Sequence, residues 1–258
     1  FTGNKFEFRM LGSSASVATP NIILNTAVAE ALSQFAKELE GTAPEEMEHA
    51  VHELIKRAVK KHKKVIFNGN GYTEEWIEEA KKRGLYNLVS TPDCLPQFIA
   101  DKNVELFTKH HIFTKEEIFS RYEILLENYV KTISIEAKTM KEMLAKDFLP
   151  AVERYAAAVS DNMRSMKALA PSVPTASAAS LVAFLGEAYE KISSSLDVLE
   201  KEIQETDKKT SMQEAADYCH NTLLASMEEL RKTADEAEAK IPDEELPYPT
   251  YDALLFSV

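Results

Sequence analysis

The chain has 258 residues, of which 45% are hydrophobic and 28% are charged, and its formal net charge is −12. This length can supply a sizeable core in one large or two small domains. The negative charge argues against nucleic acid or an anionic membrane surface as a partner. With only 7 glycines and 10 prolines, the composition favours long helices over a β-sandwich.

The first strong pattern is an alternation of charged and apolar residues at residues 1–11, which predicts a β-strand. Lys5, Glu7 and Arg9 then share one face of the strand, and the apolar residues between them share the other. A carboxylate between two cations suits a metal-bound polyphosphate, because the carboxylate can hold Mg²⁺ while the cations neutralise phosphoryl oxygens. The alternative is a solvent-facing amphipathic strand with a surface ion pair.

Two helices are predicted next along the chain. Pro20 opens the first, with apolar residues at a period near 3.6. Residues 42–45 resemble a capping box that starts the second. On this second helix His49 and His52 have a spacing that can hold a metal, but a solvated polar helix face is the preferred interpretation.

Three long amphipathic helices dominate the rest of the chain. A capping box at Thr114 to Glu117 starts the first, and its apolar stripe, which includes Leu125, continues to Met166 with a kink or restart expected at Pro150. The second long helix extends to residue 203, and the third runs from Met212 to about residue 234. Short connections between them predict an antiparallel bundle whose stripes form the core. The prolines of the tail should keep it extended.

Cysteine usage and hydropathy indicate the cellular compartment in which the protein works. Cys94 and Cys219 lie far apart without a CxxC spacing, which argues against a disulfide framework or zinc site and fits a reducing cytoplasm. There is no apolar run of about 18 residues that would span a membrane. Because the chain starts at Phe1 without Met, we expect it to be a fragment of a longer protein.

Several segments together resemble one enzyme family. The opening residues 1–10 and the following Asn21 to Asn25 are similar to the C-terminal catalytic segment of type III glutamine synthetases. Residues 95–99, followed by residues 112–118, resemble the last catalytic-domain helices of that family, and residues 255–258 resemble its closing residues. These matches occur in the order that the family has them.

The resemblance implies roles for the three charged residues of the strand. The family motif is Arg-x-Glu-x-Arg, and this chain has Lys5-x-Glu7-x-Arg9. Glu7 would then be a ligand of a divalent ion, Mg²⁺ or Mn²⁺. Arg9 would hold glutamate or its phosphorylated intermediate, and Lys5 would stand where an arginine contacts ATP phosphates. Lysine offers a point charge in place of a bidentate fork, so the role of Lys5 is the least secure.

The resemblance also implies an organisation and an activity. The expected fold class is mainly α, a long antiparallel helical bundle with a short N-terminal β-strand left over from an α+β catalytic domain. Residues 1–145 would be the C-terminal part of that domain, with a type III insertion around 43–90; residues 146–240 would be a bundle insertion and 241–258 an extended tail.

In this interpretation the complete protein is a cytoplasmic ATP-dependent glutamate–ammonia ligase of nitrogen metabolism. It would act through a γ-glutamyl phosphate and assemble as a ring-shaped homo-oligomer. The fragment alone would be inactive, because one glutamate cannot make a two-metal site. The alternative from another functional class is a non-catalytic helical scaffold or oligomerisation module, and a degenerate synthetase that binds without turnover is a third possibility.

Overall fold

The computed structural model describes residues 16–256, and these are mainly helical with no β-strand among them. The mainly α fold class is therefore confirmed for this part of the chain, whereas the predicted strand at residues 1–11 lies outside it. The described residues divide into two compact units, the first formed by residues 16–89 and 94–122 and the second by residues 90–93 and 123–256. The units are described separately below.

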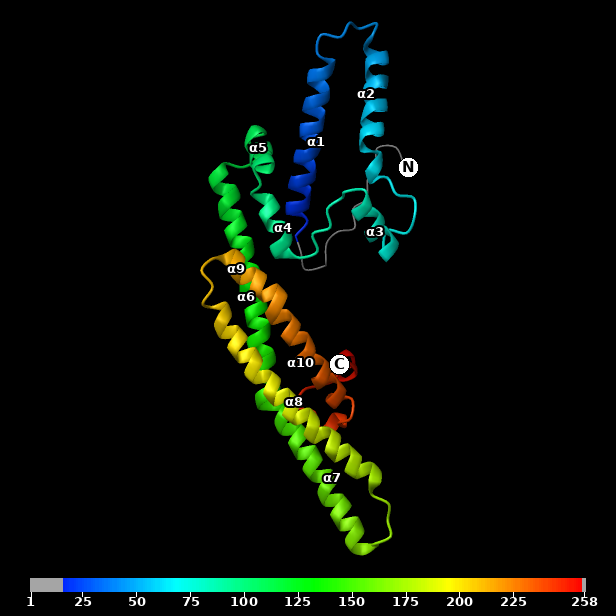
Figure 1. Cartoon of the computed structure of the whole chain (residues 1–258), viewed down its shortest axis with the longest axis vertical. Coiled ribbons are helices and arrows are strands. Elements are labelled where there is room, and N and C mark those ends of the chain that lie inside the picture. The colour runs from blue at the N-terminus through cyan, green and yellow to red at the C-terminus, as the bar shows by residue number, and fades with distance from the viewer. Residues whose placement is uncertain (1–15, 257–258) are drawn as a thin grey trace. The chain divides into compact units, whose positions relative to one another are not determined.

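The first unit contains a pair of long helices followed by short ones (Figure 1). Helix α1 packs against both α2 and α5. The helices that lie wholly in this unit are α1 (Ala18–Leu39), α2 (Met47–His62), the 3₁₀ turn η1 (Lys63–Val65), α3 (Glu74–Lys82) and α5 (Asp101–Lys109). Helix α4 (Thr91–Phe98) begins in the second unit, and α6 (Lys115–Met143) begins in the first and continues into the second.

Two of the helix starts predicted from the sequence can be compared with the structure. The capping box at Thr114 is confirmed, because the Thr114 amide donates to Glu117 Oε2 at 2.8 Å and the Glu117 amide donates to Thr114 Oγ1 at 3.2 Å. The capping box at residues 42–45 is wrong. Helix α2 begins later, at Met47, because Pro44 takes part in a tight turn in which its carbonyl accepts from the Met47 amide.

The second unit is an antiparallel helical bundle, as the sequence predicts, with α8 packed against both α7 and α10 (Figure 1). Connections of a few residues reverse the chain after α7 and again after α8. Its elements after α6 are the π-helical turn η2 (Leu144–Phe148), α7 (Leu149–Leu169), α8 (Ala176–Thr206), α9 (Met212–Tyr218), the π-helical turn η3 (Cys219–Leu223), α10 (Leu224–Glu238), the 3₁₀ turn η4 (Asp243–Glu245) and α11 (Tyr251–Leu255).

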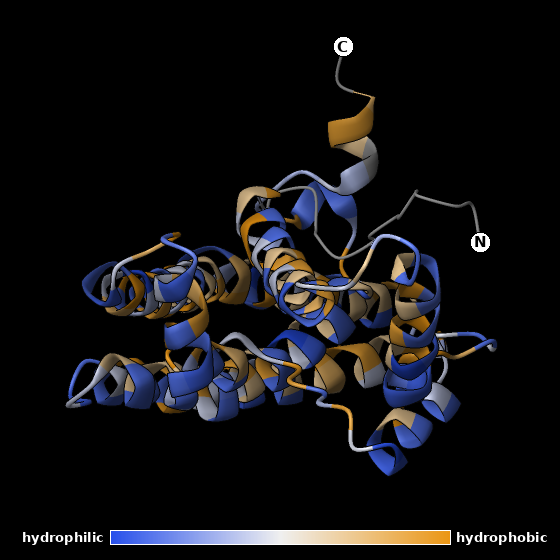
Figure 2. Cartoon of the chain, turned by 90° about the horizontal axis from the view of Figure 1, so that it is seen from above, coloured by the Kyte–Doolittle hydropathy of each residue, from blue (hydrophilic) through white to orange (hydrophobic). Residues whose placement is uncertain are grey.

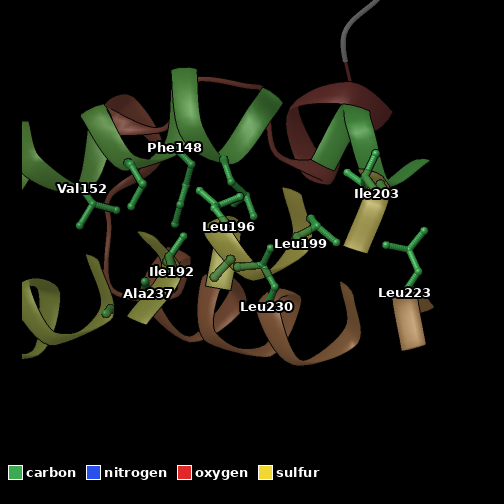
Figure 3. Close-up of a cluster of buried hydrophobic side chains, with 14 of the residues drawn as sticks. Phe148, Val152, Ile192, Leu196, Leu199, Ile203, Leu223, Leu230 and Ala237 are labelled. Atoms are coloured by element: carbon green, nitrogen blue, oxygen red, sulfur yellow. The ribbon is translucent and has the colours of Figure 1, made fainter. Parts of the chain in front are cut away.

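The bundle core consists of aliphatic and aromatic side chains that three successive helical segments direct toward one another (Figure 3). Phe148 and Val152 come from the η2–α7 segment, Ile192 and Leu199 from α8, and Leu230 from α10; all five are at most 1% exposed. Colouring by hydropathy shows that hydrophilic and hydrophobic residues alternate along the helices (Figure 2), as amphipathic helices require.

The chain passes Pro150 without a sharp break, because the irregularity falls one turn earlier. In η2 the Leu149 amide donates to the Leu144 carbonyl, five residues back. Proline lacks an amide hydrogen and its ring crowds the carbonyl four residues before it, here that of Lys146. A wider π-helical turn relieves that crowding, so Pro150 can occupy the first turn of α7.

Three predicted stripe positions are wrong. Leu125 is 38% exposed, and its neighbour Leu126 is fully buried in its place. Met166 and Met212, which were expected in the core, are exposed near helix ends. In the tail, residues 246–250 are non-helical, and Tyr251 to Leu255 then form the short helix α11.

Candidate functional site

The residues with the strongest chemical signal in the sequence, Lys5, Glu7 and Arg9, lie outside the described part of the chain. Their assignment as nucleotide contact, metal ligand and substrate contact stays a prediction from the motif. The polar sites that the structure does describe are a carboxylate cluster on α1, an aromatic cluster beside α3, and a groove in the bundle unit.

The second candidate from the sequence was the histidine pair on α2. His49 and His52 lie on this helix, and the nearby Glu53 carboxylate accepts from Lys56 Nζ at 3.0 Å. Across residues 16–256 no group of three or more His, Cys, Asp or Glu side chains is placed to hold a metal ion. Both histidines are exposed, which is the position expected on a polar helix face.

The most connected carboxylate of the first unit is Glu30 on α1. It accepts from Lys109 Nζ at 2.7 Å, from Gln34 Nε2 at 2.7 Å, and contacts His110 Nε2 at 2.6 Å. Lys109 ends α5 and His110 follows it, so the cluster joins α5 to α1. No local sequence motif indicates this contact, because Glu30 and His110 are 80 residues apart.

The Glu30 carboxylate of this cluster carries a fixed negative charge. Hydrogen bonds from Lys109, then Gln34, then His110 lower the pKa of Glu30 to about 2. A carboxylate with such a low pKa stays ionised at neutral pH and is a poor proton shuttle, because a general base works best with a pKa near the working pH. We therefore interpret the cluster as a structural link between two helices.

A second cluster positions the loop before α3. Trp76 stacks on Phe67 with ring centroids 4.3 Å apart, and the Arg83 guanidinium lies 5.6 Å from the Trp76 ring centroid. Arg83 also donates to the Ile66 carbonyl at 2.8 Å and to Glu79 Oε1 at 2.6 Å. Arg83 Nε and Nη1 both donate to protein acceptors, which indicates that this cluster holds the loop in place.

A concave surface lies in the bundle unit, between α6, α10 and the tail. We call it the tail groove; its main part has a volume of about 770 Å³. An adjoining hollow of about 490 Å³ shares the side chains of Met143, Asp235 and Tyr248 with it. The charged residues around the two hollows are Glu136, Arg231, Asp235, Glu238 and Asp243.

The field in the tail groove is negative. Burial, together with the negative charges of Glu238 and Asp235, raises the pKa of Tyr248 to about 12. Burial also raises the pKa of Glu238, and Asp235 adds to that shift. Arg231 is the single cation among the lining residues, and it already pairs with Asp235 at 3.4 Å. The groove therefore suits a positively charged group.

Comparison with known proteins addresses the identity of the chain. Residues 50–167 match the family described as the glutamine synthetase C-terminal domain. A glutamine synthetase of Butyrivibrio fibrisolvens is 42% identical to this chain across 100% of its length. The chain belongs to the glutamine synthetase family.

Two further relatives agree with this assignment to the glutamine synthetases. A type-3 glutamine synthetase of Dictyostelium discoideum is 35% identical over 99% of the chain, and a glutamine synthetase of Bacteroides fragilis is 29% identical over 100% of it. The resemblance to the family that the motifs indicate is thereby confirmed. The chain spans 37%, 36% and 36% of the length of these three relatives.

Among the described residues of this chain, no helix is both long and apolar enough to cross a membrane.

Proposed function

We propose that this chain is the C-terminal portion of a type III glutamine synthetase that ligates ammonia to L-glutamate at the expense of ATP. The observation that carries the proposal is the Lys5-x-Glu7-x-Arg9 pattern in a chain similar along its whole length to glutamine synthetases. In this proposal residues 1–145 complete the catalytic domain, including an insertion around 43–90, while residues 146–240 form an inserted bundle and residues 241–258 the tail.

The chemistry assigns a different task to each of the three residues. The Glu7 carboxylate supplies the hard oxygen ligand that Mg²⁺ or Mn²⁺ prefers. Arg9 offers a guanidinium fork that matches a carboxylate or an acyl phosphate. Lys5 places a positive charge near the phosphates of ATP. The divalent ions, when bound, neutralise charge on the transferring phosphoryl group.

A single carboxylate does not hold two metal ions, so the remaining ligands are assigned to the portion that the longer relatives possess and this chain does not contain. The isolated 258-residue chain is accordingly expected to be inactive. We also propose cytoplasmic location and assembly into a ring-shaped homo-oligomer, on the strength of the family assignment.

The test measures ATP- and ammonia-dependent glutamine formation by the complete protein and by single variants. Glu7→Gln removes the charged metal ligand and keeps the shape, and Arg9→Ala removes the substrate contact. We expect each to lower kcat/KM by at least about a hundredfold, which is the size of effect seen when one electrostatic contact to a transition state is lost.

Two controls make the outcome interpretable. Lys5→Arg restores the family residue and is expected to preserve activity, and Glu48→Gln changes an exposed carboxylate on α2 and is expected to have no effect. Wild-type activity in both Glu7→Gln and Arg9→Ala would refute the site assignment. A complete protein that makes no glutamine in any variant would favour the scaffold alternative.

A further inference from the structure

The far end of the α7–α8 hairpin is unusual for this acidic chain, because it bears cations and no carboxylate. Between Asn162 and Gly186 the sequence has no Asp or Glu, although the whole chain has 42 of them. The charged residues of that segment are Arg164 and Lys167, both exposed. We call residues 162–176, which contain both cations, the hairpin tip.

The hairpin tip is also apolar where it meets solvent. Leu169 is 89% exposed and Met166 is 50% exposed, on the same helical turn as Lys167. Large apolar side chains exposed together and edged by charge are characteristic of surfaces that meet a partner. The tip therefore presents a cationic and apolar projection at the end of a two-helix arm (Figure 1).

The tail groove has the opposite charge and a matching apolar component. Glu136, Asp235, Glu238 and Asp243 supply four carboxylates against the one guanidinium of Arg231. Its apolar lining includes three methionines, which adapt readily to differently shaped side chains. These are Met140, Met143 and Met227. The groove can thus accept both the charge and the apolar side chains of the hairpin tip.

The tip and the groove of one molecule cannot meet. The groove is lined by residues of α6 and by Leu144 at the start of η2, whereas Leu169 lies 20 residues beyond Leu149 on a continuous α7. At 1.5 Å per residue this separates them by about 30 Å along a rigid helix. A tip that occupies a groove must therefore come from a second copy of the chain.

From this complementarity we infer that two copies of the chain associate by exchange, each placing the Arg164–Leu169 turn of its hairpin tip in the tail groove of the other. Because every copy carries both surfaces, the same contact can form twice about a two-fold axis. The existing ion pair of Arg164 with Asp161, at 3.1 Å, does not oppose this, because both side chains are more than two-thirds exposed and such pairs contribute little. The inference rests on surface chemistry and is independent of catalysis.

Charge reversal tests both surfaces. The tip variant carries Arg164→Glu and Lys167→Glu, and the groove variant carries Asp235→Lys and Asp243→Lys, all at exposed positions. Sedimentation velocity would be measured on the 258-residue chain over a concentration series up to about 100 μM, which covers the affinities of weak specific interfaces. We expect the wild-type chain to dimerise and each variant to bind itself at least tenfold more weakly.

Mixing the two variants provides the decisive measurement. The reversed tip matches the reversed groove, and the unaltered tip of the groove variant matches the unaltered groove of the tip variant. An equimolar mixture should therefore dimerise like the wild type, although each component alone binds itself at least tenfold more weakly. A matched control, Glu228→Lys with Glu236→Lys, changes the net charge by the same amount on α10 but outside the groove, and should dimerise like the wild type.

Each unfavourable outcome overturns the inference. A wild-type chain that stays monomeric across the series would do so, as would dimers that persist in both single variants or a mixture that remains monomeric. Circular dichroism of every variant verifies that the helices are intact, so that a loss of association reports on the surfaces. As a second measurement, Leu169→Ser should weaken dimerisation without changing the charge.

Discussion

Leu125 and Leu126 are adjacent on α6 and chemically identical, yet their environments differ. Leu126 is completely buried and Leu125 is 38% exposed. Replacing each by alanine in turn removes the same atoms from two different surroundings. The pair therefore tests directly whether the bundle unit is packed as described, with each variant serving as the control for the other.

The expected losses in the free energy of unfolding follow from the burial of each leucine side chain. A fully buried leucine loses about 2 kcal/mol of transfer free energy on truncation, and the cavity left behind adds roughly 1–2 kcal/mol. Leu126→Ala should therefore reduce the free energy of unfolding by about 3 kcal/mol. At Leu125 water can enter the space and part of the side chain is already solvated, so Leu125→Ala should cost about 1 kcal/mol.

Urea denaturation of the 258-residue chain, followed by circular dichroism at the helix band, measures both values. The midpoint should fall clearly more for Leu126→Ala than for Leu125→Ala, with little change in the denaturant slope for either. Equal losses, or a larger loss for Leu125→Ala, would show that the helix presents a different face to its neighbours and would refute the described packing.

Three further predictions concern the first unit. Thr114→Ala removes one half of a reciprocal cap and should destabilise the start of α6 by about 1 kcal/mol in urea denaturation, an effect that Thr114→Ser should largely avoid. Because the pKa of Glu30 is lowered from 4.5 to about 2, its contribution to stability is present above pH 4.5 and is lost as the pH falls towards 2; thermal melts over that range should show this loss in the wild type and less of it in Glu30→Gln. Gly69→Ala places a methyl group 2.5 Å from the Phe67 ring and should disturb its stacking with Trp76; since Trp76 is the single tryptophan, its fluorescence should shift to the red, and unchanged emission would contradict the proposed contact.

Local sequence signals predicted local structure well. The Thr114 capping box and the positions of the long helices needed only neighbouring residues, and both are confirmed. The stripe from Leu185 to Ile203 is buried as predicted, because an apolar period near 3.6 on a long helix has one low-energy solution when partner helices are available. The Leu125 error arose because both leucines fit that period, and only packing against neighbours distinguishes them.

Contacts between distant residues could not be predicted in this way. The Glu30 cluster joins side chains about 80 positions apart, and the tail groove joins α6 to residues a hundred positions later. Neither has a local motif, so their existence depends on how the helices pack. The Lys5-x-Glu7-x-Arg9 assignment shows the opposite case: a short motif indicates its chemistry directly, while its geometry lies outside residues 16–256.

The π-helical turn at Leu144 to Phe148 has a consequence for how this protein tolerates insertions and deletions. One residue added to or taken from a helix rotates everything after it by about 100° and shifts it by about 1.5 Å. Deleting a single residue from this turn would leave a regular helix, yet it would rotate Ala151 and Val152, now at most 1% exposed, out of their places against the rest of the bundle. The number of residues in this segment is thus constrained as tightly as their identity.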